Sequence, residues 1–261
     1  MNQEPILLEY DGPLAQITLN RPEVLNAMNL AWVQGFEEAV SRVADEADVR
    51  LVLVRGAGRA FCAGLDLDML AREGMPPGFY EGQERAFRQL ELMDKITVAI
   101  LHGYCLGGGL QLAIACDLRI CSTDARLGLP AIREGLFPGM APFRLPRLIG
   151  LGPARRLILS GELIGPEEAL HLGLVDHLIS AHRFDAELGQ ILEGYLKAPY
   201  TAAISSKRLM RRGFEAPFDV VYQESLPLLA NCLASPEVKA AGEAWRQRRA
   251  DRLGRQAPSG S

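Results

Sequence analysis

The chain has 261 residues, of which 48% are hydrophobic and 23% charged, so it can bury a sizeable core and disorder is excluded as its general state. Its net charge of -4 is spread along the sequence and gives no electrostatic basis for binding nucleic acid or an anionic membrane surface. The five cysteines are an odd number without a CxxC pair, no charged-then-apolar leader opens the chain, and no apolar run reaches the roughly 18 residues of a membrane span, so we expect a cytoplasmic protein.

The first half of the chain predicts strands that alternate with helices. Short β-prone runs at 6–10 and 14–19 flank the turn Asp11-Gly12-Pro13, which predicts a hairpin. Apolar residues at helical spacing predict a helix from the N-cap Asn29 to about Ala44. The other expected elements are strands at 49–54, 96–101 and 118–121 and helices at 80–93 and 110–115. This alternation predicts an α/β core.

The second half is more helical. After Leu127, prolines punctuate short segments, and from Pro153 onward the pattern is mostly helical, apart from a brief apolar run at 174–179. The expected late helices are 187–196, 202–210, 220–233 and 238–253. We therefore predict a core at 1–200, a C-terminal helical region at 201–253 that packs on the core or on a neighbouring subunit, and a disordered tail at 254–261.

Two glycine motifs follow predicted strands of this core. Gly64 lies within FCAGLDL (61–67), and the glycines 107–109 open the helix predicted at 110–115. A helix N-terminus leaves N–H groups unpaired, and glycine lets a substrate oxygen approach them. Alone, each motif is equally explained by a turn or by close packing on a sheet. Together they offer the two backbone N–H donors that an oxyanion hole for a thioester carbonyl requires.

The order of these motifs resembles the enoyl-CoA hydratase/isomerase (crotonase) family over nearly the whole chain. The segments that carry the resemblance are NRPEVLNAMN (20–29), GRAFCAGLDL (58–67), HGYCLGGGLQLAIACDLRI (102–120) and LILSGELIGPEEALHLGLVDHLI (157–179). The resemblance implies a spiral of ββα turns followed by helices that build a homotrimer or a dimer of trimers. It also implies an acyl-coenzyme A substrate, held as an enolate by two N–H groups, with no separate cofactor and no metal.

The resemblance assigns roles position by position. The N–H donors of the oxyanion hole would be Leu65 and Gly108. The residues implied to contact the coenzyme are Leu25, Ala63, Leu65, Asp66, Leu67, Asp68 and Lys207, with the basic run Arg246, Arg248 and Arg249 near its phosphates. Asp66 could instead cap the next turn, and the basic run could be a solvated helix face.

The chain departs from the family pattern where protons are handled. Hydratases of this family carry one glutamate two residues after the triple glycine and another just after a later proline, and here those positions hold Gln111 and Ala131. Neither side chain transfers a proton, although the Gln111 amide could orient a water or a substrate carbonyl. The aspartate that some family members use would stand at Gly139, where it is also missing. Ordinary two-carboxylate hydration is therefore not expected.

Glu134 is the candidate for a relocated carboxylate. It lies three residues past Ala131, so the two side chains would share a face if the segment is a helical turn. An exposed surface charge is the alternative interpretation. Weaker candidates near the site are Tyr80, Glu81 and Glu84, whereas Cys62, Cys105 and His102 are expected to pack.

The leading hypothesis is an atypical enoyl-CoA isomerase, lyase or hydratase that stabilises a thioester enolate at Leu65 and Gly108, with Gln111 and Glu134 near the reacting carbons. The rival hypothesis is a non-catalytic acyl-CoA-binding protein that has kept the fold and lost the carboxylates. The third hypothesis is an assembly scaffold that binds no ligand. Motifs of serine hydrolases, P-loop proteins and zincins are absent from the sequence.

Overall fold

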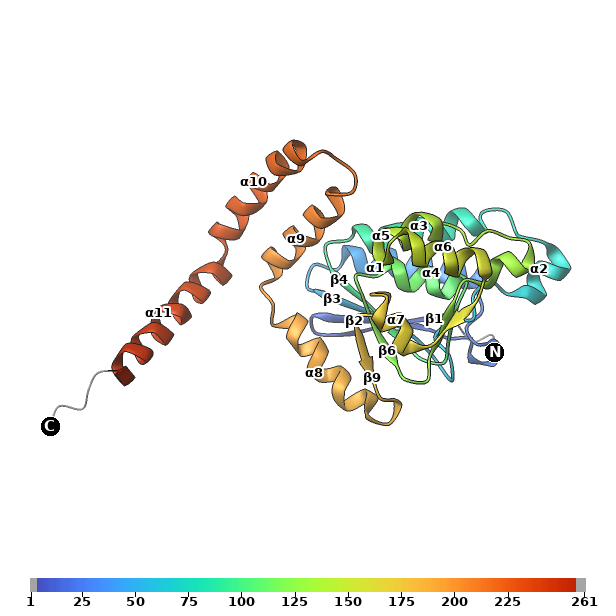
Figure 1. The fold of residues 1–261 in the computed structure, drawn as a ribbon, viewed down its shortest axis with the longest axis horizontal. Helices are drawn as coiled ribbons and strands as arrows, with labels where there is room; N and C mark the ends of the chain where they lie inside the picture. The colour runs from blue at the N-terminus through green and yellow to red at the C-terminus, as the bar shows by residue number, and fades with distance from the viewer. Residues whose placement is uncertain (1–3, 257–261) are drawn as a thin grey trace. The chain divides into compact units, whose positions relative to one another are not determined.

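The computed structural model describes residues 4–256 and contains a six-stranded sheet (Figure 1). The antiparallel hairpin of β1 and β2 pairs Ile6 with Leu19, and every later strand adds in parallel. The strands, in spatial order, are β1 (Ile6–Asp11), β2 (Leu14–Leu19), β3 (Leu51–Gly56), β4 (Ile96–Leu101), β6 (Leu118–Ser122) and β9 (His177–Ile179).

A second, smaller sheet has three short strands. It consists of β5 (Tyr104–Leu106), β7 (Arg126–Gly128) and β8 (Leu163–Ile164). The helices up to residue 196 are α1 (Leu30–Asp45), α2 (Leu67–Glu73), α3 (Phe79–Leu92), α4 (Gly108–Ala115), α5 (Ala141–Ile149), α6 (Leu151–Ser160), α7 (Pro166–His171) and α8 (Phe184–Leu196), with 3-10 turns η1 (Pro22–Val24), η2 (Pro130–Glu134) and η3 (Ala181–Arg183).

The parallel strands are buried on both faces, which explains their continuous apolar sequences. On one face Val52 and Val54 of β3 pack in the larger core with residues of α1, α3 and α4. On the other face Leu51 and Leu53 pack in a smaller core that includes Leu192 of α8. Because successive side chains of a strand point to opposite faces, one apolar run supplies both cores.

The chain divides by its contacts into two compact units, Met1–Leu196 and Lys197–Ser261. The helices of the second unit are α9 (Tyr200–Arg212), α10 (Phe218–Ala234) and α11 (Pro236–Gln256). Within it, α10 contacts both α9 and α11, and Glu237 accepts a hydrogen bond from the Tyr200 N–H. None of the helices within 4–256 is long and apolar enough to cross a membrane.

The predicted α/β fold with a C-terminal helical region is confirmed. The strand at 49–54 begins two residues later than predicted, at Leu51, and the helices α2 and α5 were not predicted. The division by contacts falls at 196/197, four residues before the domain boundary at 200/201, which stays a prediction. Helix α11 continues through Gln256, so the first three residues of the predicted tail at 254–261 are helical; residues 257–261 lie outside the described part of the chain.

Candidate active site

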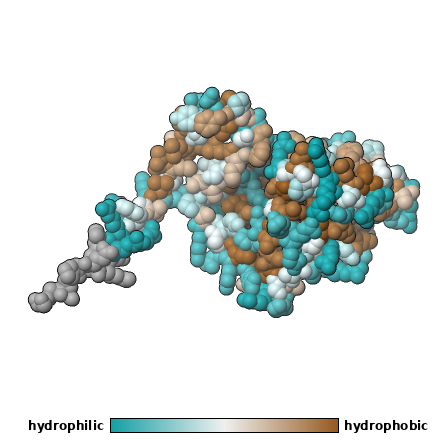
Figure 2. All heavy atoms as spheres, viewed as in Figure 1, coloured by the Kyte–Doolittle hydropathy of each residue, from teal (hydrophilic) through white to brown (hydrophobic). Residues whose placement is uncertain are grey.

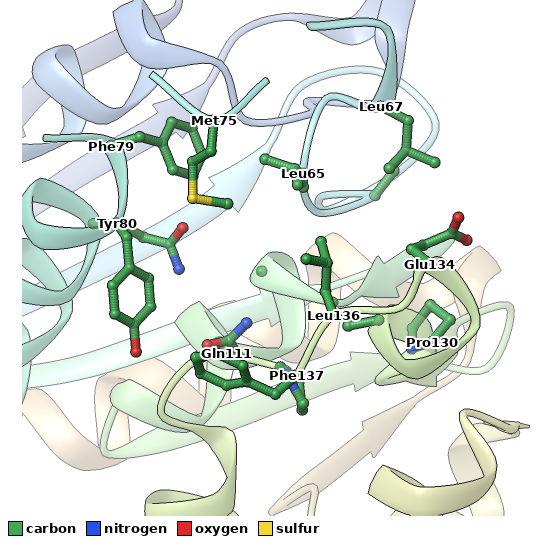
Figure 3. A pocket seen from close by; sticks show the side chains of 17 residues that line it. Leu65, Leu67, Met75, Phe79, Tyr80, Gln111, Pro130, Glu134, Leu136 and Phe137 are labelled. Carbon is green, nitrogen blue, oxygen red and sulfur yellow. The ribbon is translucent and has the colours of Figure 1, made fainter. Parts of the chain in front are cut away.

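A cavity of about 380 Å³ lies in the first unit (Figure 3). Its walls come from segments 63–67, 75–83, 107–111 and 130–139, which are distant in the sequence. Most of the lining is apolar, as in the usual small-molecule site, and the polar side chains in it are Tyr80, Gln83, Gln111 and Glu134.

The two glycine motifs meet at the wall of this cavity. Phe61 and Cys62 donate backbone hydrogen bonds to the carbonyls of His102 and Tyr104, so the two segments run side by side up to their glycines. Gly64 has a φ of +97°, and a Cβ on it would stand 2.8 Å from the carbonyl oxygen of Leu106 and 3.1 Å from the nitrogen of Gly108. Only glycine permits this backbone contact.

The N–H groups of Leu65 and Gly108 face this junction without a backbone partner among the described residues. Leu65 forms a single parallel bridge with Met28, in which its neighbours make the hydrogen bonds: Gly64 accepts from the Met28 N–H, and Asp66 donates to the Met28 carbonyl. The N–H of Leu65 itself therefore points away from Met28. Gly108 is the first residue of α4, where helix N–H groups lack internal acceptors. Both residues line the cavity.

Asn26 explains how the loop of Gly64 is held. Its side-chain Nδ2 donates to the carbonyls of Ala57, Ala60 and Phe61 at 2.9, 2.9 and 3.1 Å, and its Oδ1 accepts from the Arg21 N–H. Asn26 is fully buried and has a φ of +59°, a conformation that asparagine tolerates better than most residues. The NRPEVLNAMN segment thus stabilises the chain that leads into the Gly64 loop through the hydrogen bonds of Asn26.

Asp66 has structural partners. It is the N-cap of α2, where its side chain accepts from the Met69 N–H, and it forms an ion pair with Arg21 at 3.0 Å. This observation favours the capping interpretation, and contact with the coenzyme remains a prediction. Asp68 is exposed and pairs with Arg72.

The other predicted coenzyme contacts fall into three groups. Ala63 and Leu67 line the cavity together with Leu65. Leu25 does not line it, but its carbonyl accepts a hydrogen bond from the Ala63 N–H. Lys207 belongs to α9 of the second unit, while all the lining residues belong to the first. Its assignment to a phosphate stays a prediction.

Gln111 and Ala131, the two residues predicted to stand in place of proton-transferring glutamates, both line the cavity. Gln111 is only 6% exposed, and its Oε1 is buried without a hydrogen-bond partner among the described residues. A buried amide oxygen without a hydrogen-bond donor destabilises the folded state, so such groups are rare in proteins and often lie at functional sites.

Glu134 lines the cavity from the 3-10 turn η2, and in Figure 3 it lies beside Leu67, on the other side of Leu136 from Gln111. Residues three apart are eclipsed in a 3-10 turn, and Ala131 and Glu134 both line the cavity. Glu134 is exposed overall and is the only carboxylate among the described lining residues.

Three further residues line the cavity: Tyr80, a weaker candidate from the sequence, and Gln83 and Met75, which the sequence did not indicate. Tyr80 lines the cavity and packs edge-to-face on Phe137 at 6.3 Å. Burial and then the nearby charge of Glu84 raise the pKa of its phenol, so it stays protonated at neutral pH. Gln83 and Met75 also line the cavity, and their helical or loop spacing carried no signal that they would.

The predicted packing role of the cysteines agrees with their surroundings. Burial raises the pKa of the Cys62 thiol to about 12, and its Sγ donates to the carbonyl of Asn26 at 3.1 Å. His102 does not line the cavity, and its Nε2 is 3.0 Å from the Gly58 carbonyl oxygen. No group of three or more His, Cys, Asp or Glu side chains within the described residues could hold a metal ion.

Residues 9–251 match the family model described as enoyl-CoA hydratase/isomerase. The chain belongs to the enoyl-CoA hydratase/isomerase family. Among its relatives, the short-chain-enoyl-CoA hydratase of Clostridium acetobutylicum is 31% identical, covering 95% of this chain and 97% of the relative. The crotonyl-CoA hydratase of Syntrophomonas wolfei is 32% identical, with the same coverage of 95% and 97%.

The solved structures agree with this family assignment. The enoyl-CoA hydratase of Bacillus anthracis has a TM-score of 0.86 and 28% identity, covering 94% of this chain and 96% of that chain. An enoyl-CoA hydratase/isomerase from Marinobacter aquaeolei has a TM-score of 0.84 and 31% identity, covering 94% and 97%. The fold and family predicted from the motifs are therefore confirmed, and the roles of the individual site residues stay predictions.

Proposed function

We propose that this family member processes an acyl-CoA thioester, whose carbonyl oxygen accepts hydrogen bonds from the N–H groups of Leu65 and Gly108. The observation that carries the proposal is the meeting of the two glycine loops at the wall of an apolar cavity, where both N–H groups have no backbone partner among residues 4–256. Two fixed N–H donors stabilise the negative charge that develops on a thioester oxygen as the α-carbon loses a proton.

Glu134 is the proposed acid and base. It is the carboxylate of the lining, whereas Gln111 and Ala131 cannot transfer protons. A carboxylate that takes a proton from one carbon of the enolate system and returns it to another performs an isomerisation, and one that assists a leaving group performs a lyase reaction. We therefore propose an atypical isomerase, lyase or hydratase with its proton-transfer group on η2.

The second candidate function is a non-catalytic acyl-CoA-binding protein. The observation that favours it is the presence of Gln111 and Ala131 at the cavity wall, together with the exposure of Glu134, since an exposed carboxylate is also explained as a surface charge. Both candidates use the same oxyanion hole, so only a measurement of proton transfer separates them.

The test is incubation with a panel of enoyl-, dienoyl- and oxoacyl-CoA esters in deuterated water, followed by mass spectrometry. An enolising enzyme exchanges α-protons and converts at least one ester, and Glu134→Gln lowers that rate by about 100-fold or more, the usual contribution of a general acid or base. Tight binding without exchange or product in any ester would instead support the binding protein.

Glu73→Gln is the matched control, because Glu73 is an exposed carboxylate on α2 that does not line the cavity. It should keep the wild-type rate. Equal rates in wild type and Glu134→Gln would remove Glu134 from the mechanism. If calorimetry detects no binding of any coenzyme A thioester, both proposed functions are contradicted.

A further inference from the structure

A half-buried carboxylate, that of Glu84, lies beside Gly139, as the Gln111 amide does, but it does not line the cavity. Gly139 separates the two groups: a Cβ on this glycine would stand 2.3 Å from Oε1 of Gln111 and 3.3 Å from Oε1 of Glu84. Two oxygen atoms thus face the same small space beside Gly139, and Oε1 of Gln111 has no donor there among the described residues.

Glu84 is fixed in this position. Its Oε2 forms a 2.7 Å ion pair with Nη1 of Arg144, whose Nε binds Glu91, and the Arg144 side chain is only 7% exposed. The other oxygen, Oε1, receives a long 3.4 Å contact from the Met140 N–H. A carboxylate held by arginine accepts hydrogen bonds on both oxygens and donates none. Because the Glu84 oxygen beside Gly139 can only accept, the Gln111 amide is better oriented with its NH₂ group, not its oxygen, toward this space.

An amide satisfies this requirement by turning about its last side-chain bond. The nitrogen and oxygen of glutamine are nearly equal in size, so a half-turn exchanges their places without a clash, and the hydrogen-bond network decides between the two orientations. With Nε2 toward Glu84, the unpartnered oxygen leaves its buried position and turns to the cavity that Gln111 lines.

We propose that Glu84 is a positioning residue that holds the Gln111 amide with its NH₂ group toward the carboxylate and its carbonyl oxygen toward the acyl group. Gln111 follows Gly108 by three residues on α4, about 4.5 Å along the helix, so its amide faces the acyl carbons just beyond the thioester carbonyl. An exposed carbonyl oxygen selects a hydrogen-bond donor. Glu84 thereby makes Gln111 discriminate between acyl groups that carry a hydrogen-bond donor near C3 and those that carry only an acceptor there, an inference that rests on the proposed acyl-CoA function.

The test compares three thioesters by calorimetry: butyryl-CoA, 3-hydroxybutyryl-CoA and 3-oxobutyryl-CoA, with mass spectrometry at the end of each titration to check for product. Wild type should bind the hydroxy ester about tenfold more tightly than butyryl-CoA, the worth of one hydrogen bond, and the oxo ester no more tightly than butyryl-CoA. Glu84→Gln should reduce the tenfold preference to less than about threefold and improve binding of the oxo ester, because a neutral amide no longer dictates one orientation of Gln111.

Two further variants distinguish a loss of orientation at Gln111 from a general loss of protein stability in Glu84→Gln. Glu91→Gln also removes a carboxylate from Arg144 but leaves Glu84 in place, so the preference should stay near tenfold. Gln111→Met leaves the Glu84–Arg144 pair intact and should abolish the preference. Tighter binding of the oxo ester by wild type, or an unchanged preference in Glu84→Gln, overturns the inference. If all three esters bind equally, only this inference fails; if none binds, the proposed function fails with it.

Discussion

Gly139 leaves room for the Gln111 side-chain amide at the wall of the cavity. A methyl group there would overlap Oε1 of Gln111, and the φ of +43° strains any residue with a Cβ. We expect Gly139→Ala to destabilise the protein by about 1–3 kcal/mol and to displace the Gln111 amide, with at least a tenfold loss of thioester turnover or affinity. Thermal unfolding and the thioester assays check the two effects.

Gly150→Ala separates strain from the clash. Gly150 also has a positive φ, +80°, but a Cβ there meets no atom within 4 Å. It should cost about 1 kcal/mol and leave thioester binding unchanged. Equal losses of affinity in the two variants would show that the space beside Gly139 has no special role.

The Cys62 thiol predicts a loss of stability at alkaline pH. Burial raises its pKa from 9.0 to about 12, so the folded protein favours the neutral thiol. A raised folded-state pKa contributes stability that is fully present below pH 9 and is lost as the pH rises from 9 to about 12, by at most about 1.4 kcal/mol per pH unit. Urea denaturation at pH 8, 10 and 11 should show this decline, and Cys62→Ala should show a smaller one. Parallel declines would assign the effect to other groups.

The residue scale also shows what sequence can and cannot reveal about the site. The order of the motifs predicted that Leu65, Gly108 and Gln111 lie at one cavity, and all three line it. This prediction was possible because glycines needed for close backbone contacts form a recognisable pattern in the sequence. Glu84 left no such pattern. Its Oε1 lies near the same space beside Gly139 as Oε1 of Gln111, and Arg144 holds its other oxygen. The role proposed for Glu84 therefore depends on three segments that meet only in space.

At the scale of elements, Arg119 connects β6 to the chain that leads into β9. Its side chain is 2% exposed, donates to the carbonyls of Leu174 and Cys116, and pairs with Asp176 at 2.7 Å. Arg119→Met would leave these buried acceptors and the Asp176 charge without a donor. We expect a loss of about 3–5 kcal/mol, measured by urea denaturation.

Arg156 provides the comparison for this prediction. It pairs with two carboxylates, Glu162 and Glu168, where Arg119 pairs with one, but its side chain is 45% exposed. Water replaces its partners, so Arg156→Met should change the unfolding free energy by no more than about 1 kcal/mol. A similar cost for the two variants would contradict the importance given to burial.

The same scale explains which elements the sequence predicted. The hairpin and β4 were predicted within a residue or so, because long apolar runs bounded by turns determine a strand locally. Helix α5 was missed because Pro146 lies inside it, and proline usually interrupts a helix. The three short strands of the smaller sheet were missed because two or three residues carry no measurable periodicity, and their pairing is decided by tertiary contacts.

At the scale of the whole molecule, the second unit has helices but almost no core. Ile204 is its only buried hydrophobic residue among those described, and Figure 2 shows hydrophobic residues on the surface of its helices. The large exposed apolar side chains of α9 and α10 and the turn between them are Met210, Phe214, Phe218, Val220, Tyr222, Leu226, Leu229 and Leu233. Sequence periodicity predicted these helices well, but it could not say what covers their apolar faces, because that depends on other surfaces.

The last prediction concerns this exposed surface and the homotrimer or dimer of trimers implied by the resemblance. We propose that copies of the chain cover the apolar face of α10, so light scattering coupled to size exclusion should give a mass of three or six times 28.5 kDa. Leu229 is 57% exposed, and Leu229→Asp would place a charge in the apolar contact between copies, which should shift the mass to that of the monomer. Gln223→Asp, at an exposed position of the same helix, should leave the mass unchanged. A wild-type monomer at all concentrations would contradict this proposal. It would show that the apolar side chains of α10 stay exposed to water.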